Sequence, residues 1–301
     1  MLIGKLLNIN RNEVGRVSFS WFATLFYKIG FVIGWTIIVG MFVGRYGIVS
    51  LPFLFVVNAL FSIFGTVVYS FIREKMSPEM IIFTTILITS SVLCLAVFFG
   101  SSNPFVFFGL LLAAEAVFLV QLKIVFNGFM ETLFSPLESE RAFPVIESSE
   151  TIGGIIAGLL VIAFSSTMEV SSFVYLWIFS LFCMLFCVLF RKFIKKDIYK
   201  VSLSSVENSV GHSSHGSVGL FSKMKDIFNQ IKTVSFIKGL LFVVIFQWIF
   251  ANLIEFQYTK AVTENISSAV LNSGSGFEHA LVHSLGDRKS TRLNSSHRLT
   301  S

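Results

Sequence analysis

Seven apolar segments, each about 20 residues long or longer, limit what this chain can fold into. They are Val17–Val43, Ile48–Phe71, Met80–Phe99, Phe105–Phe129, Val145–Phe164, Ser171–Phe190 and Gly239–Tyr258. A helix needs about 20 apolar residues to cross the roughly 30 Å hydrocarbon layer of a membrane. Charged residues make up only 13% of the chain, against about 25% in soluble domains. The sequence therefore predicts an all-α polytopic membrane protein with no folded domain outside the membrane.

The positions of the lysines and arginines predict the orientation of these spans. Fifteen lie in the N-terminal segment and in every second loop after it, whereas the opposite side has only Arg45 and Lys260. Because cytoplasmic loops are enriched in Lys and Arg, this bias places the N-terminus in the cytoplasm. The formal net charge of +6 thus has a topological cause, and we expect no nucleic-acid partner.

One loop is longer and more basic than the others, and it divides the chain. Residues 191–238 contain a Ser- and Gly-rich stretch followed by a basic amphipathic segment, which is typical of a flexible linker and a surface helix. We expect residues 1–190 to form an N-terminal six-helix bundle, 191–238 to be a basic cytoplasmic linker, and 239–286 to begin a second bundle. Two bundles joined in this way are typical of secondary transporters.

The last fifteen residues differ abruptly from the rest. Residues 287–301 read DRKSTRLNSSHRLTS, which is polar and basic without hydrophobic periodicity. This stretch resembles a translated sequencing-library adapter, and such additions are excluded from fold reasoning. We interpret 287–301 as an artefact of that kind and expect the second bundle to be truncated before it.

Lys28 is the clearest candidate for a functional residue. It lies eleven residues into the first predicted span, which places it about 16 Å deep at the rise of an α-helix. An ionisable residue at that depth is costly, about 2.5–3.5 kcal/mol on insertion scales, and therefore points to a functional site. The alternative is a lysine that reaches the membrane surface or is paired structurally inside the bundle.

The fourth predicted span carries a polar stripe. Glu115, Lys123, Asn127 and Glu131 fall within an arc of about 160° on an ideal helix. Glu115 is deep and is a candidate for solute binding or proton coupling. Lys123 and Glu131 approach the cytoplasmic rim, where long side chains reach water, so they are equally well explained as rim charges.

Glu255 is the last candidate, in the seventh span. It follows Gly239 by sixteen residues, so it lies toward the outer surface, where it lines a pathway or marks the helix end. The sequence has no phosphate-binding loop, no H-E-x-x-H and no G-x-S-x-G, which are the signatures of ATP hydrolysis, zinc proteolysis and serine hydrolysis. We expect no enzyme activity, no metal site and no cofactor.

Three segments together resemble the bacterial and plastid ATP/ADP translocase family, which is similar to the major facilitator superfamily. They are LPFLFVVNALFSIFGTVVYS at 51–70, FSPLESERAFPVIESSETIGGIIAGLL at 134–160 and ANLIEFQYTKAV at 251–262. The resemblance implies a major facilitator-like fold, here an N-terminal six-helix bundle plus the first helix of a second bundle. It also implies a bacterial inner membrane or an equivalent one. Glu255 matches the acid of the family's N-L-[IV]-E segment, and Lys28 is a looser match to its basic position in the first span.

The resemblance implies a secondary transporter that works by alternating access, with ATP and ADP exchange or another anionic metabolite as its solute. A chain of phosphates needs more than one buried cation, and this half offers Lys28 as the clear one, so the solute remains open. The expected partners are a small anionic solute and the lipid bilayer. The alternative function is a membrane scaffold or sensor that binds a partner or anionic lipid through the 191–238 loop.

Overall fold

The structure is a computed structural model, and it describes residues 13–73, 76–99, 103–165, 168, 172–190 and 235–273. The side chains of residues 104, 235 and 266–273 lie outside this description. So do residues 191–234 of the predicted linker and the 287–301 tail. Within the described ranges the regular secondary structure is entirely helical.

The helices follow one another along the chain with short connections. Their bounds are α2 (Val14–Tyr46), η1 (Ile48–Ser50), α3 (Leu51–Arg73), α4 (Pro78–Phe99), α5 (Pro104–Leu112), η2 (Ala113–Leu119), α6 (Val120–Glu131), α7 (Pro136–Phe164), α8 (Phe173–Phe190) and α11 (Ser235–Ser273). Seven of the described stretches are long and apolar enough to cross a membrane, and each coincides with one predicted span. The number and the helical nature of the spans confirm the prediction of an all-α, multi-pass membrane protein.

The fourth span combines three elements. It runs over Phe105–Glu131, and its middle part, η2, is a π-helix in which the Val120 N–H donates to the Glu115 carbonyl. This i→i+5 bonding widens the helix, and short π-helical stretches are frequent at functional sites. An ideal helix, on which the predicted polar stripe was drawn, therefore does not describe the part of this span that contains Glu115.

The fifth span begins earlier than its apolar residues suggest. Helix α7 starts at Pro136, nine residues before the predicted start at Val145. Pro136 occupies the first turn, where its missing N–H costs nothing, and the Glu138 carboxylate accepts a hydrogen bond from the Ser135 N–H at 2.8 Å. This capping box starts the helix in a polar stretch, so Glu150 lies at the centre of α7.

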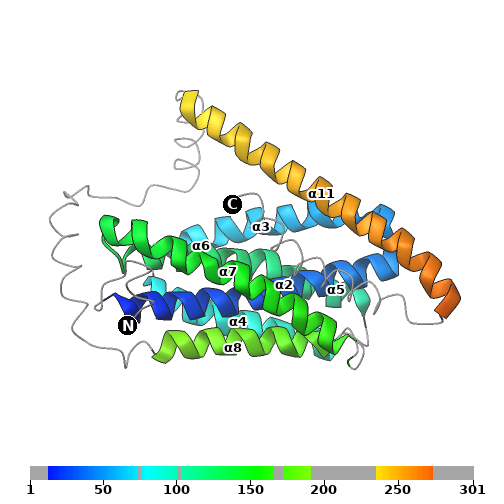
Figure 1. Ribbon diagram of the computed structural model, residues 1–301, viewed down its shortest axis with the longest axis horizontal. Coiled ribbons are helices and arrows are strands. Elements are labelled where there is room, and N and C mark those ends of the chain that lie inside the picture. Colours follow the sequence, from blue (N-terminus) through cyan, green and yellow to red (C-terminus); the bar gives the residue numbers. More distant parts are fainter. Residues whose placement is uncertain are drawn as a thin grey trace, which may run out of the picture. The chain divides into compact units, whose positions relative to one another are not determined.

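The chain divides into two compact units, Met1–Lys196 with Val262–Ser301, and Asp197–Ala261. In the first unit, α2 is the central helix, with α7 and α8 packed along it. Figure 1 shows α2, α4, α7 and α8 running along a common direction. Helix α4 in turn packs against α8 and against α5, η2 and α6, and α3 covers η2.

Small residues of α2 allow α8 to approach closely. Gly30 and Gly34 both face Trp177, whose side chain is fully buried. A Cβ atom at Gly34 would lie 2.6 Å from Cζ2 of that indole ring, which is closer than real Cβ contacts. Gly30 and Gly34 therefore lie at the α2–α8 interface, where small residues permit close helix packing.

Candidate functional site

Two lysines from different helices share one carboxylate in the first unit. Lys28 of α2 lies 3.6 Å from Oε2 of Glu150, through its Nζ atom. The Nζ atom of Lys123, on α6, donates a hydrogen bond to Oε1 of the same glutamate. We call these three residues the lysine–glutamate cluster. Their side chains keep only 24–29% of their surface exposed, so the cluster is largely enclosed by protein.

Aromatic rings cover both lysines. The Lys28 ammonium lies 5.4 Å from the centre of the Phe31 ring, and the Lys123 ammonium lies 5.8 Å from the centre of the buried Tyr27 ring. A cation over an aromatic face gains about 0.5–2 kcal/mol, most where water is excluded. These rings therefore help to hold two positive charges at this depth.

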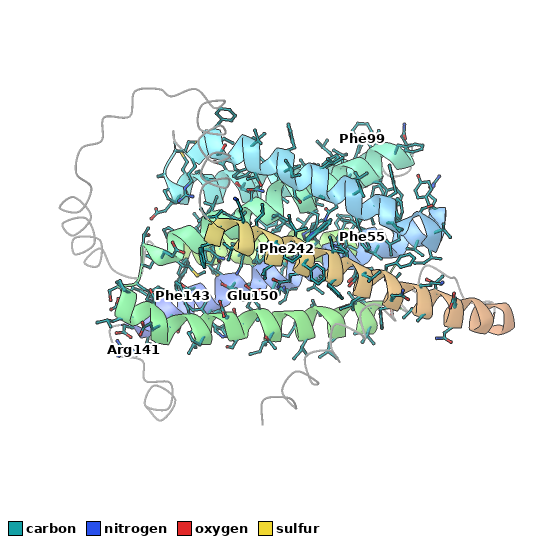
Figure 2. All side chains as sticks on the ribbon, turned by 90° about the horizontal axis from the view of Figure 1, so that it is seen from above. Phe55, Phe99, Arg141, Phe143, Glu150 and Phe242 are labelled. Carbon is teal, nitrogen blue, oxygen red and sulfur yellow. The ribbon has the colours of Figure 1, made fainter. Side chains whose placement is uncertain are left out.

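The backbone of α7 approaches α2 closely beside the cluster. A Cβ atom at Gly153 would lie 2.9 Å from the carbonyl oxygen of Leu25 and 3.1 Å from Cβ of Lys28. Only glycine fits there, because backbone atoms cannot move aside as a side-chain end can. Gly153 follows Glu150 by one helical turn, so this contact brings the glutamate within reach of Lys28. Figure 2 shows Arg141, Phe143 and Glu150 in order along α7, which runs beside α2.

A pocket of about 410 Å³ lies beside the cluster, between α2, α6 and α7. Its volume lies within the range of small-molecule sites, about 300–1,000 Å³. Met130, Phe143 and Ile146 supply its apolar wall. Its polar lining consists of Thr24, Lys123, Asn127, Glu131, Glu147 and Glu150.

Thr24 differs from other threonines of the bundle. The hydroxyls of Thr36, Thr66 and Thr89 each donate to the carbonyl one turn earlier, at 2.7–2.9 Å. Thr24 is only 1% exposed, and its hydroxyl has no hydrogen-bond partner among the residues that the structure describes. Thr24 also lines the pocket.

The predicted site residues of the first and fourth spans do not all lie together. Lys28 and Lys123 meet at Glu150, and Asn127 lies one turn beyond Lys123 on the pocket wall. Glu115 is 1% exposed and lies in the π-helical segment, outside the pocket lining.

Glu255 lies on α11, whose residues up to 261 belong to the second unit. Its side chain is half-buried, and its backbone carbonyl accepts a hydrogen bond from the Thr259 hydroxyl at 2.8 Å. This bond lies within the helix and leaves the proposed role of Glu255 a prediction.

The end of the bundle next to the pocket is held by arginines. The Arg16 guanidinium binds both carboxylate oxygens of Glu138, at 2.9 and 3.3 Å, and also donates to the Leu133 carbonyl. Arg141 of α7 lies 3.5 Å from the carboxylate of Glu13. Two ion pairs therefore tie the start of α2 to the start of α7.

Glu150 is the site residue that the sequence-based prediction missed. It lies in the run SSETIGG, which resembles the polar border of a span because the apolar stretch follows it. A signal was present: an acid one turn before a pair of glycines on a helix, in a chain whose buried lysine needs a counterion.

Among the described residues, no three His, Cys, Asp or Glu side chains are grouped so as to hold a metal ion. What the cluster and pocket can do is bind charged and hydrogen-bonding groups. Comparison with protein families, curated proteins and solved structures finds no match to this chain.

Proposed function

We propose that this protein is a secondary membrane transporter that works by alternating access and binds its solute at the lysine–glutamate cluster. One observation carries the proposal: two enclosed lysines on separate membrane helices share a single carboxylate beside a pocket of about 410 Å³. Two cations and one anion leave one positive charge that an anionic group of a solute can neutralise. Ionisable residues inside membrane spans mark such solute pathways.

The shared carboxylate gives the solute a way to change the conformation. Glu150 joins α7 to α2 through Lys28 and to α6 through Lys123. An anion that binds Lys123 competes with Glu150 and weakens the link between α6 and α7. A ligand shifts a conformational equilibrium only by interacting differently with the two states, and competition for a lysine is such a difference.

The solute belongs to the small molecules that carry an anionic group. The resemblance to ATP/ADP translocases adds nucleotides to the candidates. In the predicted orientation, the end of the pocket near Glu131, where α6 ends and α7 begins, faces the cytoplasm. The membrane is then a bacterial inner membrane or its equivalent.

Uptake into liposomes containing the purified full chain tests this proposal. We expect uptake of a labelled small anion, from a panel that includes ATP, to fall at least tenfold in Lys28→Gln and in Lys123→Gln. The matched control is Arg45→Gln, which removes an exposed cation at the opposite end of α2 and should leave uptake unchanged. Uptake that is equal in all four proteins would refute the role of the cluster.

The alternative proposal, a scaffold or sensor, predicts the reverse pattern. Its basic loop at 191–238 lies almost wholly outside the described residues. If deletion of this loop abolished the cellular phenotype while Lys28→Gln and Lys123→Gln left it intact, the scaffold would replace the transporter.

A further inference from the structure

The pocket lining carries charges of both signs. At the inner end, Lys123 contacts Glu150, which also pairs with Lys28. Glu131 on α6 and Glu147 on α7 also line the pocket, and both are exposed. We call Glu131 and Glu147 the acidic mouth.

The spacing along α6 separates Lys123 from Glu131. Lys123, Asn127 and Glu131 follow one another at intervals of four residues, so they lie on one face of the helix. Eight residues separate the first from the last, which corresponds to about 12 Å along the helix axis. Glu131 is therefore separated from the inner cations along the pocket, whereas Glu147 lies one turn from Glu150 on α7, about 4.5 Å along the helix axis.

The balance of charge argues against a polyanion as the solute. The pocket lining holds Lys123 and three carboxylates, those of Glu131, Glu147 and Glu150. Even with Lys28, which pairs with Glu150 from outside the lining, one negative charge is in excess. A solute with several negative charges would meet repulsion at the mouth. A simple cation would match the mouth but gain nothing from the inner lysines.

Neutral hydrogen-bonding groups support an oxygen-rich anionic group at the inner end. Thr24, which is 1% exposed and whose buried hydroxyl has no partner among the described residues, lines the pocket together with Lys123. A carboxylate accepts hydrogen bonds from both a hydroxyl and an ammonium group. A charge-assisted bond from Lys123 would be the stronger of the two.

We propose that the pocket binds a zwitterionic solute, an amino-carboxylate whose two charged groups are separated by several bonds. Its carboxylate binds Lys123 and Thr24, and its ammonium group binds the acidic mouth. The inference rests on the proposed transport function and narrows the solute class of the same site.

Binding to the purified full chain in detergent, measured by calorimetry, tests this inference. The probes are glycine, 4-aminobutyrate and 6-aminohexanoate, with hexanoate, hexylammonium and ATP for comparison. We expect one of the longer amino-carboxylates to bind at least tenfold more tightly than hexanoate, hexylammonium and ATP. Preference for a longer over a shorter member of the series would measure the distance between Lys123 and the acidic mouth.

Three variants assign the contacts. In the double variant Glu131→Gln/Glu147→Gln, the preference for the amino-carboxylate over hexanoate should largely disappear while hexanoate binds as well as before or better. Thr24→Val keeps the shape of the side chain without its hydroxyl and should weaken amino-carboxylate binding about fivefold. Glu140→Gln, which changes an exposed acid of α7 outside the pocket, should change nothing.

The outcomes separate this inference from the function on which it rests. If hexanoate or ATP bound as tightly as every amino-carboxylate, or if no amino-carboxylate bound, the zwitterion inference would be overturned. The transporter proposal would still stand if Lys123→Gln lowered uptake of another anion. If Lys123→Gln changed neither binding nor uptake of any probe, the proposed function itself would fail.

Discussion

Glu150 forms ion pairs with both of the lysines that lie in membrane spans. Lys28 and Lys123 are the two Lys or Arg residues that lie inside the predicted apolar spans, and both pair with this glutamate. Removing one partner of a buried ion pair leaves an uncompensated charge, which costs more than the pair itself contributes.

We predict that Glu150→Gln destabilises the protein. Removing one partner of a fully buried ion pair costs about 3–5 kcal/mol. Because these side chains are partly exposed, we expect a loss of about 1–3 kcal/mol in the free energy of unfolding. The measurement is the midpoint of thermal unfolding in detergent. Adding Lys28→Gln and Lys123→Gln should recover much of the loss, because no unpaired charge then remains. An unchanged midpoint in Glu150→Gln would contradict the prediction.

The sequence predicted part of this site because an isolated charge in an apolar run is conspicuous. Lys28 and Lys123 could be singled out in that way, and Asn127 by its helical spacing. Glu150 was missed, since it stands among serines and other acids at the border of a span. The glycines that follow it were a local signal, but the contact between α2 and α7 that pairs it with Lys28 is a tertiary feature.

At the scale of the helix, close approach decides which residues meet. Gly153 brings α7 onto α2 at the level of Lys28, and Gly34 admits Trp177 of α8 on another face of α2. The spans themselves were predictable because each contains enough consecutive apolar residues to cross the hydrocarbon layer. The early start of α7 was missed because hydropathy is insensitive to capping, although Ser135 and Glu138 form a capping box that the sequence displays. The π-helical segment at Glu115 could not be predicted, because hydropathy is insensitive to hydrogen-bond register.

We predict that Gly153→Ala separates α7 from α2. Its methyl group would lie 2.9 Å from the Leu25 carbonyl oxygen, and overpacking of this kind costs about 1–3 kcal/mol. The midpoint of thermal unfolding should fall, and binding of the preferred probe should weaken with it. Gly109→Ala is the control, because no atom lies within 4 Å of its added Cβ. Equal behaviour of the two variants would contradict the close contact.

The α2–α8 contact gives a separate prediction. Gly34→Ala places a methyl group 2.6 Å from the fully buried Trp177 ring and should also cost about 1–3 kcal/mol. In Gly34→Ala/Trp177→Phe, the smaller ring leaves room for the methyl group, so the combined loss should be less than the sum of the single losses. Additive losses in this double-mutant cycle, measured by thermal unfolding, would show that the two residues do not interact.

For the whole molecule, the seven described apolar helices establish a multi-pass membrane protein, while the orientation remains a prediction. Its basis is the fifteen-to-two bias of Lys and Arg between the two sides, which sets topology during insertion.

Fusions of alkaline phosphatase, which is active only outside the cytoplasm, test the orientation in a bacterial host. We expect a fusion after Gly47, at the end of α2, to be active and a fusion after Ser77, before α4, to be inactive. Replacing Lys5, Arg11 and Arg16 by Gln should weaken this difference. The reverse pattern of activity in the unmodified chain would invert the assignment and place the acidic mouth outside the cell.

The shared carboxylate also affects the order of events during synthesis, because Lys28 is made before Glu150. A ribosome adds about 5–20 residues per second, so Glu150 leaves it about 6–24 s after Lys28. During that interval the first helix must enter the bilayer without its eventual counterion, at the cost that membrane insertion exacts from a lone lysine. A nascent chain halted before the fifth span would therefore hold its first helix in the lipid less firmly than one halted after it.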